Sequence, residues 1–363
     1  MRCCRPFSTQ CGKAMKTTFI STISLWNSPR NALAKMQVDL AKANQEIATG
    51  RYSDVGLELG YRAGQGISLR QERSELDALI DGNGTVSLRL NVTKTSLDNI
   101  RSTAETYLNS LLSLPPLERG AETVRDSAAL NLKALTAELN KSSGGQYLFA
   151  GTNTKQKPVN DYIAGSPAKT AVDAAFLGHF GRTQTAPTVF DITAEEMRLF
   201  LNDSTNDFNK LFDGSDWDKW SAAADKNIES KISTSEKIET STNANEAAMR
   251  KLAKAYTIAS DLGIAGMRTE TQQVVVDKVM QLLGEVTNDL VEIQARLGDA
   301  ETKVKSANDR MDLQRKILDQ GVGRLEEVDP AEAKTRVDAL TTQIQMSYSL
   351  TAQLRQLSLL NYL

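Results

Sequence analysis

Residues 329–363 read DPAEAKTRVDALTTQIQMSYSLTAQLRQLSLLNYL, the pattern of one long amphipathic helix. Asp329 is a favourable N-cap, Pro330 suits the first helical position, and Glu332 occupies the capping-box position. Apolar side chains then recur every three or four residues, which places them along one stripe that needs a partner. The stripe consists of Val337, Leu340, Ile344, Tyr348, Leu350, Leu354, Leu357 and Leu360.

A second apolar stripe lies near the other end of the chain. Ser28 and Pro29 again form a cap followed by a first-turn proline, and Gly50 ends the predicted helix. The apolar positions between them are Leu33, Met36, Leu40, Ala43 and Ile47. Helices of about 20 and 30 residues are roughly 30 and 45 Å long and cannot form a globular core alone. We therefore expect both terminal helices to pack against long partners in an assembly interface.

Composition excludes several classes of partner. The 363 residues carry 43 Lys and Arg against 45 Asp and Glu, a net charge of -2 without the basic surplus typical of nucleic-acid or anionic-membrane binding. No apolar stretch approaches the roughly 18 residues of a membrane span, so we expect no membrane insertion. The three cysteines are Cys3, Cys4 and Cys11, so a disulfide-stabilised core is not expected.

Periodicity predicts a mainly α fold, with a long antiparallel helical bundle or coiled-coil rod formed by both chain halves. A small mixed α/β domain is inserted in the middle, where aromatics and prolines gather. Met15 opens a coherent segment, so the residues before it read as an upstream, disordered extension. The predicted organisation is 1–14 extension, 15–50 N-terminal assembly helix, 51–145 first half of the rod, 146–240 inserted domain, 241–320 second half of the rod and 321–363 C-terminal assembly helix.

Local signals refine these segments. Gly82 and Gly84 predict a helix exit, and Pro115 with Pro116 predicts a break. In the inserted domain, strands are predicted at 147–150 and 188–192. Thr193 and Glu196 form a capping box that opens a short helix over 195–201.

Signals for catalysis are weak. The single histidine, His179, lies between two glycines and reads as a turn or packing residue rather than a general base. The sequence shows no zinc-ligand spacing and no phosphate-binding glycine loop. The glycines at 56, 60, 64 and 66 form a glycine-rich run, but it does not fit G-x-G-x-x-G. Glu326 and Glu327 are adjacent on a predicted helix, diverge, and are read as a solvated face. We expect no enzyme, no catalytic residue, no cofactor and no metal.

Four passages resemble the flagellin superfamily and, within it, the hook–filament junction group of hook-associated protein 3. The first begins at Met15 and includes Asn31-Ala32-Leu33, and the last is Leu357-Ser358-Leu359-Leu360. Between them lie the sequence EIATGR at 46–51 and the sequence YLFAGT at 147–152, whose family-motif residues are Tyr147, Leu148, Phe149, Gly151 and Thr152. The segment 52–60 departs from the acidic, alanine-rich stretch that flagellins place there, which favours the junction group.

The resemblance implies a structural subunit of the bacterial flagellum whose two chain ends pair as helices that order on assembly. It implies an adaptor between hook-side proteins and the filament, secreted by type III export to the extracellular hook–filament junction for cell motility. The implied partners are copies of itself in a ring or helical array, hook-associated protein 1, flagellin and an export chaperone. Filament flagellin itself is the alternative, followed by a secreted coiled-coil effector or tip protein.

Overall fold

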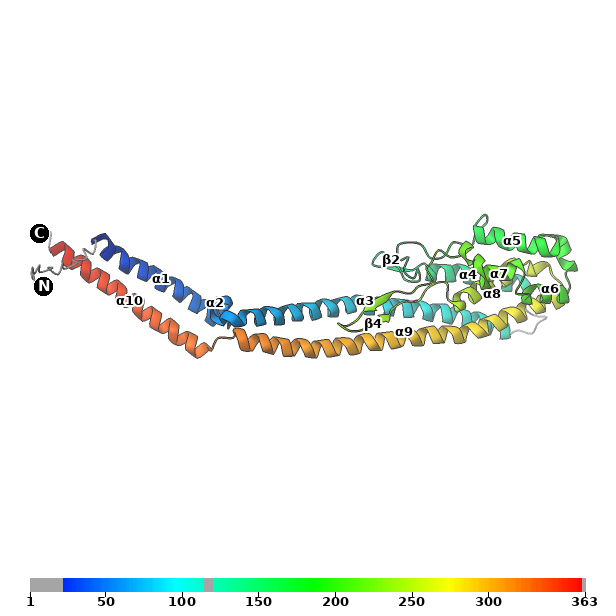
Figure 1. Cartoon of the computed structure of the whole chain (residues 1–363). Helices are drawn as coiled ribbons and strands as arrows, with labels where there is room; N and C mark the ends of the chain where they lie inside the picture. Colours follow the sequence, from blue (N-terminus) through cyan, green and yellow to red (C-terminus); the bar gives the residue numbers. More distant parts are fainter. Residues whose placement is uncertain (1–21, 114–119, 361–363) are drawn as a thin grey trace, which may run out of the picture. The chain divides into compact units, whose positions relative to one another are not determined.

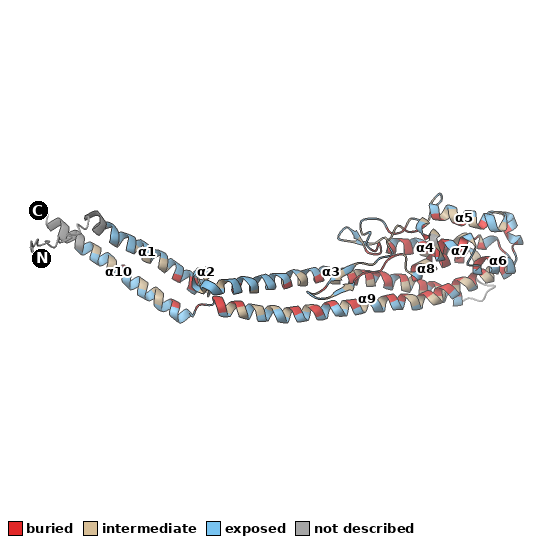
Figure 2. Cartoon of the chain, in the orientation of Figure 1, coloured by how far each residue is buried: buried red, intermediate tan, exposed pale blue. Residues whose placement is uncertain are grey.

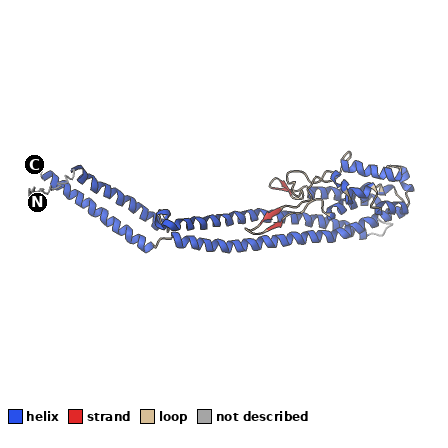
Figure 3. Cartoon of the chain, viewed as in Figure 1, coloured by secondary structure: helices blue, strands red, loops and turns tan. Residues whose placement is uncertain are grey.

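The computed structural model describes residues 22–113 and 120–360, so the predicted extension at 1–14 and the break at Pro115 and Pro116 lie outside the described residues. Of the residues it describes, most are helical and only short hairpins are strands (Figure 3), which confirms the mainly α fold. The chain divides into two compact units. We call residues 1–72 with 317–363 the terminal unit and residues 73–316 the central unit.

The terminal unit is built around two helices from opposite ends of the chain. It contains α1 (Thr22–Thr49), α2 (Val55–Leu59), the 3-10 helix η1 (Gly60–Arg62), α10 (Pro330–Leu360), the start of α3 (Ala63–Ser113) and the end of α9 (Thr269–Glu326). Helices α1 and α10 lie side by side (Figure 1). They are antiparallel, because Gln37 Nε2 donates to the Tyr348 hydroxyl at 2.9 Å while Glu46 pairs with Arg336. The predicted pairing of the two chain ends is confirmed.

The central unit is organised by antiparallel long helices. Lys94 of α3 binds Glu301 of α9 at 2.6 Å, and Asp77 of α3 binds Arg315 of α9 at 3.2 Å. Helices α4 (Ala121–Leu139) and α8 (Ala247–Asp261) pack on each other. The Tyr107 hydroxyl of α3 donates to a backbone carbonyl of α4 at 3.0 Å, so the four helices form one bundle.

Short elements fill the chain between α4 and α8. The helical ones are α5 (Pro167–Phe180), η2 (Pro187–Asp191), α6 (Ala194–Asn202), α7 (Asp207–Asp213) and η3 (Ser215–Lys219), and η4 (Ile264–Gly266) follows α8. The strands are β1 (Ser142–Ser143), β2 (Gln146–Tyr147), β3 (Glu229–Lys231) and β4 (Lys237–Glu239). They pair as two antiparallel hairpins, β1 with β2 and β3 with β4, with Ser142 opposite Tyr147 and Ser230 opposite Ile238. A chain of buried rings, Phe176, Phe200, Phe208, Phe212, Trp217 and Trp220, forms the core of this region.

Two predicted helix boundaries are wrong. Helix α3 continues through Gly82 and Gly84, because Asn83 between them is buried and donates to Asn308 Oδ1 at 2.7 Å and to the Ile232 carbonyl at 2.8 Å. These contacts offset the roughly 1 kcal/mol that each glycine costs a helix. Helix α1 begins at Thr22 rather than at Ser28, so Pro29 lies inside it. One lost backbone hydrogen bond does not end a helix that packs against a partner.

The two predicted strands are also largely wrong. Residues 148–150 leave the ladder after β2, and Ala150 makes a single bridge with Asn243. The segment 187–191 forms the 3-10 helix η2, because Pro187 fixes a turn conformation and Val189 N donates to the Ala186 carbonyl. The capping box at Thr193 and Glu196 is confirmed, and it opens α6.

Burial differs along the chain. Figure 2 shows buried residues concentrated around α4, α7 and α8, whereas α1 and α10 are mostly exposed. In the described ranges, none of the helices combines the length and apolarity that crossing a membrane requires. The long exposed helices of the terminal unit are therefore the part of the fold with the most surface left to bind a partner.

Candidate functional site

The seam between α1 and α10 is narrow. Its most buried side chains are Ala43 at 1% exposure, Ala333 at 0% and Ile344 at 9%. The other described seam residues among the predicted interface positions are half-buried: Leu33, Met36, Leu40, Val337 and Leu340. Small residues at 43 and 333 let the two backbones approach, and the larger residues flank them. The structure thus brings most of the predicted interface residues together within one chain.

The remaining predicted interface residues lie elsewhere. Ile47 is 43% exposed and Leu350 is 58% exposed, so neither is covered by the opposite helix. The side chains of Leu354, Leu357 and Leu360 lie outside the described part of the structure.

The apolar stripe of α10 changes face along the helix. At 100° per residue, the face of Ala333, Leu340 and Ile344 continues to Ser347 and Thr351, which are polar and half-buried. Met346 and Leu350, at 52% and 58% exposure, lie on a different face. The single stripe predicted from the sequence is therefore two stripes, an inner one against α1 and an outer one that starts at Met346. We call Met346 and Leu350 the outer stripe.

A polar joint connects the helix pair to the ends of α3 and α9 within the terminal unit. Gly50 ends α1 with a φ of 69°, as predicted, and its carbonyl accepts from Val328 N at 3.1 Å. Tyr52 N donates to the Glu326 carbonyl at 3.1 Å. These two backbone hydrogen bonds join residues 50–52 to residues 326–328, which come from opposite ends of the chain. The sequence EIATGR at 46–51 therefore spans the last turn of α1 and this joint.

Two buried carboxylates hold the joint. Glu46, whose side chain is 6% exposed, accepts from Arg336 Nη1 at 3.2 Å and from both the backbone N and the Oγ of Ser53 at 3.1 Å. Glu326, whose side chain is 1% exposed, forms an ion pair with Arg70 and a longer one of 3.9 Å with Arg51.

The interpretation of Glu326 and Glu327 as a solvated face is wrong for Glu326. Glu327 is exposed, whereas Glu326 points into the joint. Gly66 lies beside this carboxylate, where an added Cβ atom would make an ordinary contact of 3.5 Å with Glu326 Oε1. The sequence shows only that the two acids are adjacent. It does not show that Arg51 and Arg70, at least 256 positions away, pair with Glu326.

The YLFAGT motif lies inside the central unit, where it contacts another segment of the chain. Leu148 and Phe149 are fully buried, and the Tyr147 carbonyl accepts from Arg89 Nη2 at 2.8 Å. Gly151 has a φ of 59°, and a Cβ atom there would collide with the carbonyl oxygens of Ala224 and Lys226. Thr152, which is exposed, donates its N–H to the Lys226 carbonyl at 3.0 Å. Most of this motif therefore fixes the fold of the chain rather than facing a partner.

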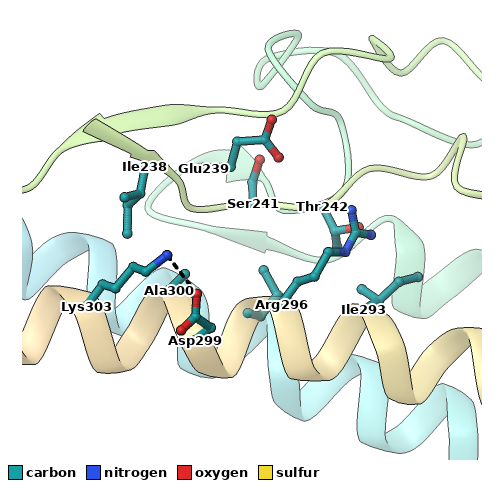
Figure 4. Close-up of a pocket in the computed structure, with 10 residues that line it drawn as sticks. Ile238, Glu239, Ser241, Thr242, Ile293, Arg296, Asp299, Ala300 and Lys303 are labelled. Carbon is teal, nitrogen blue, oxygen red and sulfur yellow. Dashed lines mark ion pairs between the residues drawn. The ribbon is translucent and has the colours of Figure 1, made fainter. Parts of the chain in front are cut away.

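His179 and a pocket beside α9 carry side chains that chemistry could use. His179 lies in the last turn of α5 and is exposed, and the centroid of its ring lies 4.7 Å from that of Phe180 and 4.9 Å from that of Phe200. A pocket of about 220 Å³ lies between the β3–β4 hairpin with its following residues and α9 (Figure 4). Its cations are paired, Lys303 with Asp299 and Arg296 with Glu246, each at 2.8 Å. Within the described ranges, no group of three or more potential metal ligands comes together.

Comparisons with known proteins agree with this architecture. The family model of the bacterial flagellin N-terminal helical region matches residues 20–154, and that of the C-terminal helical region matches residues 280–363. Together the two models cover more than half of the chain and include α1, α10, the joint and the YLFAGT motif. No curated protein matches the chain.

Among solved structures, one similar protein comes from Vibrio parahaemolyticus and is assigned to the flagellar hook-associated proteins. It has 10% sequence identity, the match covers 74% of this chain and 96% of the other, and the TM-score is 0.40.

Proposed function

Because the chain belongs to the flagellin superfamily, a family of structural and not enzymatic proteins, we propose that this flagellar subunit is the adaptor that joins the hook to the filament. The subunit works by binding neighbours through its terminal helices. It acts outside the cell, at the hook–filament junction, after export. Nothing in this role requires a reacting group, a cofactor or a metal.

The outer stripe of α10 is the observation that carries the proposal. The inner stripe is used within the subunit, whereas Met346 and Leu350 remain uncovered. The spacing of Leu354, Leu357 and Leu360 continues from Leu350 at intervals of four, three and three residues. Exposed apolar side chains such as Met346 and Leu350 on one face of a helix favour a helix-in-groove or coiled-coil contact with another protein. A neighbour's helix would bury the stripe.

The expected partners follow from this surface and from the resemblance. Copies of the chain form a ring or a helical array, and hook-associated protein 1 binds on the hook side while flagellin binds on the filament side. Apolar terminal helices with so narrow an intramolecular seam would be held by an export chaperone before assembly. The ordering of these helices is completed when neighbours bury them.

The departure at 52–60 from the flagellin pattern supports the junction over the filament. In the structure this segment is the end of the joint followed by α2 and η1, with glycines at 56 and 60 rather than an alanine-rich helix. A filament subunit remains the alternative assignment of the same terminal helices.

Immunogold labelling of sheared flagella tests the proposal. Label confined to one band at the hook end of each filament is expected for an adaptor. Label along the whole filament would instead assign the chain as flagellin, and absence of the protein from washed, sheared flagella would contradict a flagellar subunit of either kind.

A further inference from the structure

A short helical projection next to the joint carries exposed apolar side chains. It comprises residues 54–62, which we call the knob. Leu57 is 74% exposed and Tyr61 is 96% exposed. The knob has a defined conformation, since Asp54 Oδ1 caps α2 by accepting from Leu57 N at 3.0 Å and Gly60 N donates to the Gly56 carbonyl. A fixed, uncovered apolar projection is typical of a docking element.

A second uncovered surface lies on α1, on the side away from the seam. Lys35, Val38 and Lys42 are spaced by three and four residues, so they share one face of the helix. Val38 is 55% exposed. Both lysines are exposed, and within the described residues neither has an ion-pair partner. We call these three residues the outer face of α1.

The knob and the outer face of α1 carry opposite charges, and both also present exposed apolar side chains. The knob carries Asp54 and Glu58 against one cation, Arg62, and Glu58 is exposed without an ion-pair partner among the described residues. The outer face of α1 carries two exposed lysines around one apolar side chain. Apolar contact at the centre with opposite charges at the rim is the usual anatomy of a specific interface.

We propose that the knob of one copy docks on the outer face of α1 of a second copy, with Glu58 facing Lys35 or Lys42 and Leu57 and Tyr61 covering Val38. The two surfaces are different patches of the same chain, so the contact is heterologous and propagates as an open array or a ring rather than closing as a two-fold dimer. The inference rests on the proposed flagellar assembly and identifies which surfaces of two copies meet.

Site-specific cross-linking tests the contact in assembled flagella. Cells lacking their own gene would express two tagged copies, one with Leu57→Cys and the other with Val38→Cys, both with Cys3, Cys4 and Cys11 changed to Ser. A short bismaleimide applied to sheared flagella is expected to give a dimer that carries both tags. The matched control replaces Val38→Cys by Leu130→Cys, at a leucine of α4 in the central unit that is 68% exposed and therefore at least as accessible as Val38 at 55%, and should give no such dimer.

The possible outcomes distinguish failure of the knob contact from failure of the flagellar assignment. Both variants present in sheared flagella without a mixed dimer would overturn the knob contact while leaving the flagellar assignment intact. Absence of both copies, and of the unmodified chain, from sheared flagella would overturn the flagellar assignment and the contact with it.

A charge swap provides a second, independent readout. Glu58→Lys on its own, and Lys35→Glu together with Lys42→Glu, should each reduce incorporation into sheared flagella by about threefold, as expected for an exposed ion pair. Combined in one chain, the three substitutions should restore incorporation, because the lysine introduced at position 58 then faces a glutamate at either position of the neighbouring α1. Lys133→Glu, at an exposed lysine of α4, is the control and should change nothing. Additive losses in the combined variant would contradict the proposed contact.

Discussion

The carboxylate of Glu46 accepts a hydrogen bond of 3.2 Å from Arg336 Nη1, although the two residues are separated by 290 positions in the sequence. This pair fastens the last turn of α1 to the start of α10. Glu46 is nearly buried at 6% side-chain exposure, whereas Arg336 is 39% exposed. Loss of the arginine would leave a carboxylate inside the seam with only Ser53 as a donor.

Arg336→Met is therefore expected to loosen the helix pair by about 1–3 kcal/mol, the cost of a buried group that loses its partner. Hydrogen exchange of the α1 and α10 amides should accelerate correspondingly, while amides of α4 and α8 keep their rates. Lys334→Met is the matched control, because its ion pair with Asp338 is exposed at both ends and contributes at most about 1 kcal/mol. Equal acceleration in the two variants would show that the Glu46–Arg336 pair stabilises the helix pair no more than an exposed ion pair does.

The joint provides a second prediction. Arg70→Met removes the main partner of the buried Glu326 carboxylate and should destabilise the joint by up to about 3 kcal/mol, the lower end for breaking a buried pair because Arg70 is half exposed. Limited proteolysis should then cut near residues 50–53 and 327–329 sooner than in the unchanged protein. Glu327→Gln, at the exposed neighbour, should leave the cleavage rate unchanged. Wild-type resistance of Arg70→Met would contradict a structural role for this ion pair.

Gly151 gives a prediction for the central unit. Gly151→Ala should lower the free energy of unfolding by more than about 2 kcal/mol, because the left-handed backbone strain adds to a collision with two carbonyl oxygens. Gly145→Ala has a similar φ of 76° but open space around the Cβ atom, so only the strain of about 1 kcal/mol applies. Urea unfolding followed by the fluorescence of Trp217 and Trp220 measures both. Equal losses would show that the close approach at Gly151 is relieved by a small shift.

The two stripes of α10 should have separable effects. Ile344→Ala deletes a buried side chain of the seam and should cost the helix pair about 2–3 kcal/mol. Leu350→Ser lies on the exposed outer stripe and should change stability by less than about 0.5 kcal/mol while strongly reducing incorporation into flagella. Hydrogen exchange of α1 gives the first quantity, and the amount of the chain in sheared flagella gives the second. Normal incorporation of Leu350→Ser would remove the outer stripe from the assembly surface.

Helical periodicity predicted the long helices, because these depend on apolar side chains repeated over many turns, and the resemblance to flagellins added the pairing of the two chain ends. It failed where a single tertiary contact overrides a local signal. Asn83 keeps α3 helical through two glycines by reaching Asn308, and nothing near position 83 in the sequence indicates that partner.

The candidate site was predictable only in part for the same reason. Spacing alone placed Ile344 and Leu350 on one stripe, because only the folded structure shows which side of α10 the partner helix covers. The burial of Glu326 depends on Arg51 and Arg70, which the fold brings from the opposite end of the chain. The exposure of the knob is a property of the folded terminal unit.

Electron microscopy of cells that lack this gene, together with an assay for flagellin in the medium, tests the central claim of an adaptor most directly. We expect intact hooks without filaments and unpolymerised flagellin released into the medium. Normal filaments in these cells would contradict the adaptor role, and missing filaments without released flagellin would identify the chain as the filament subunit instead.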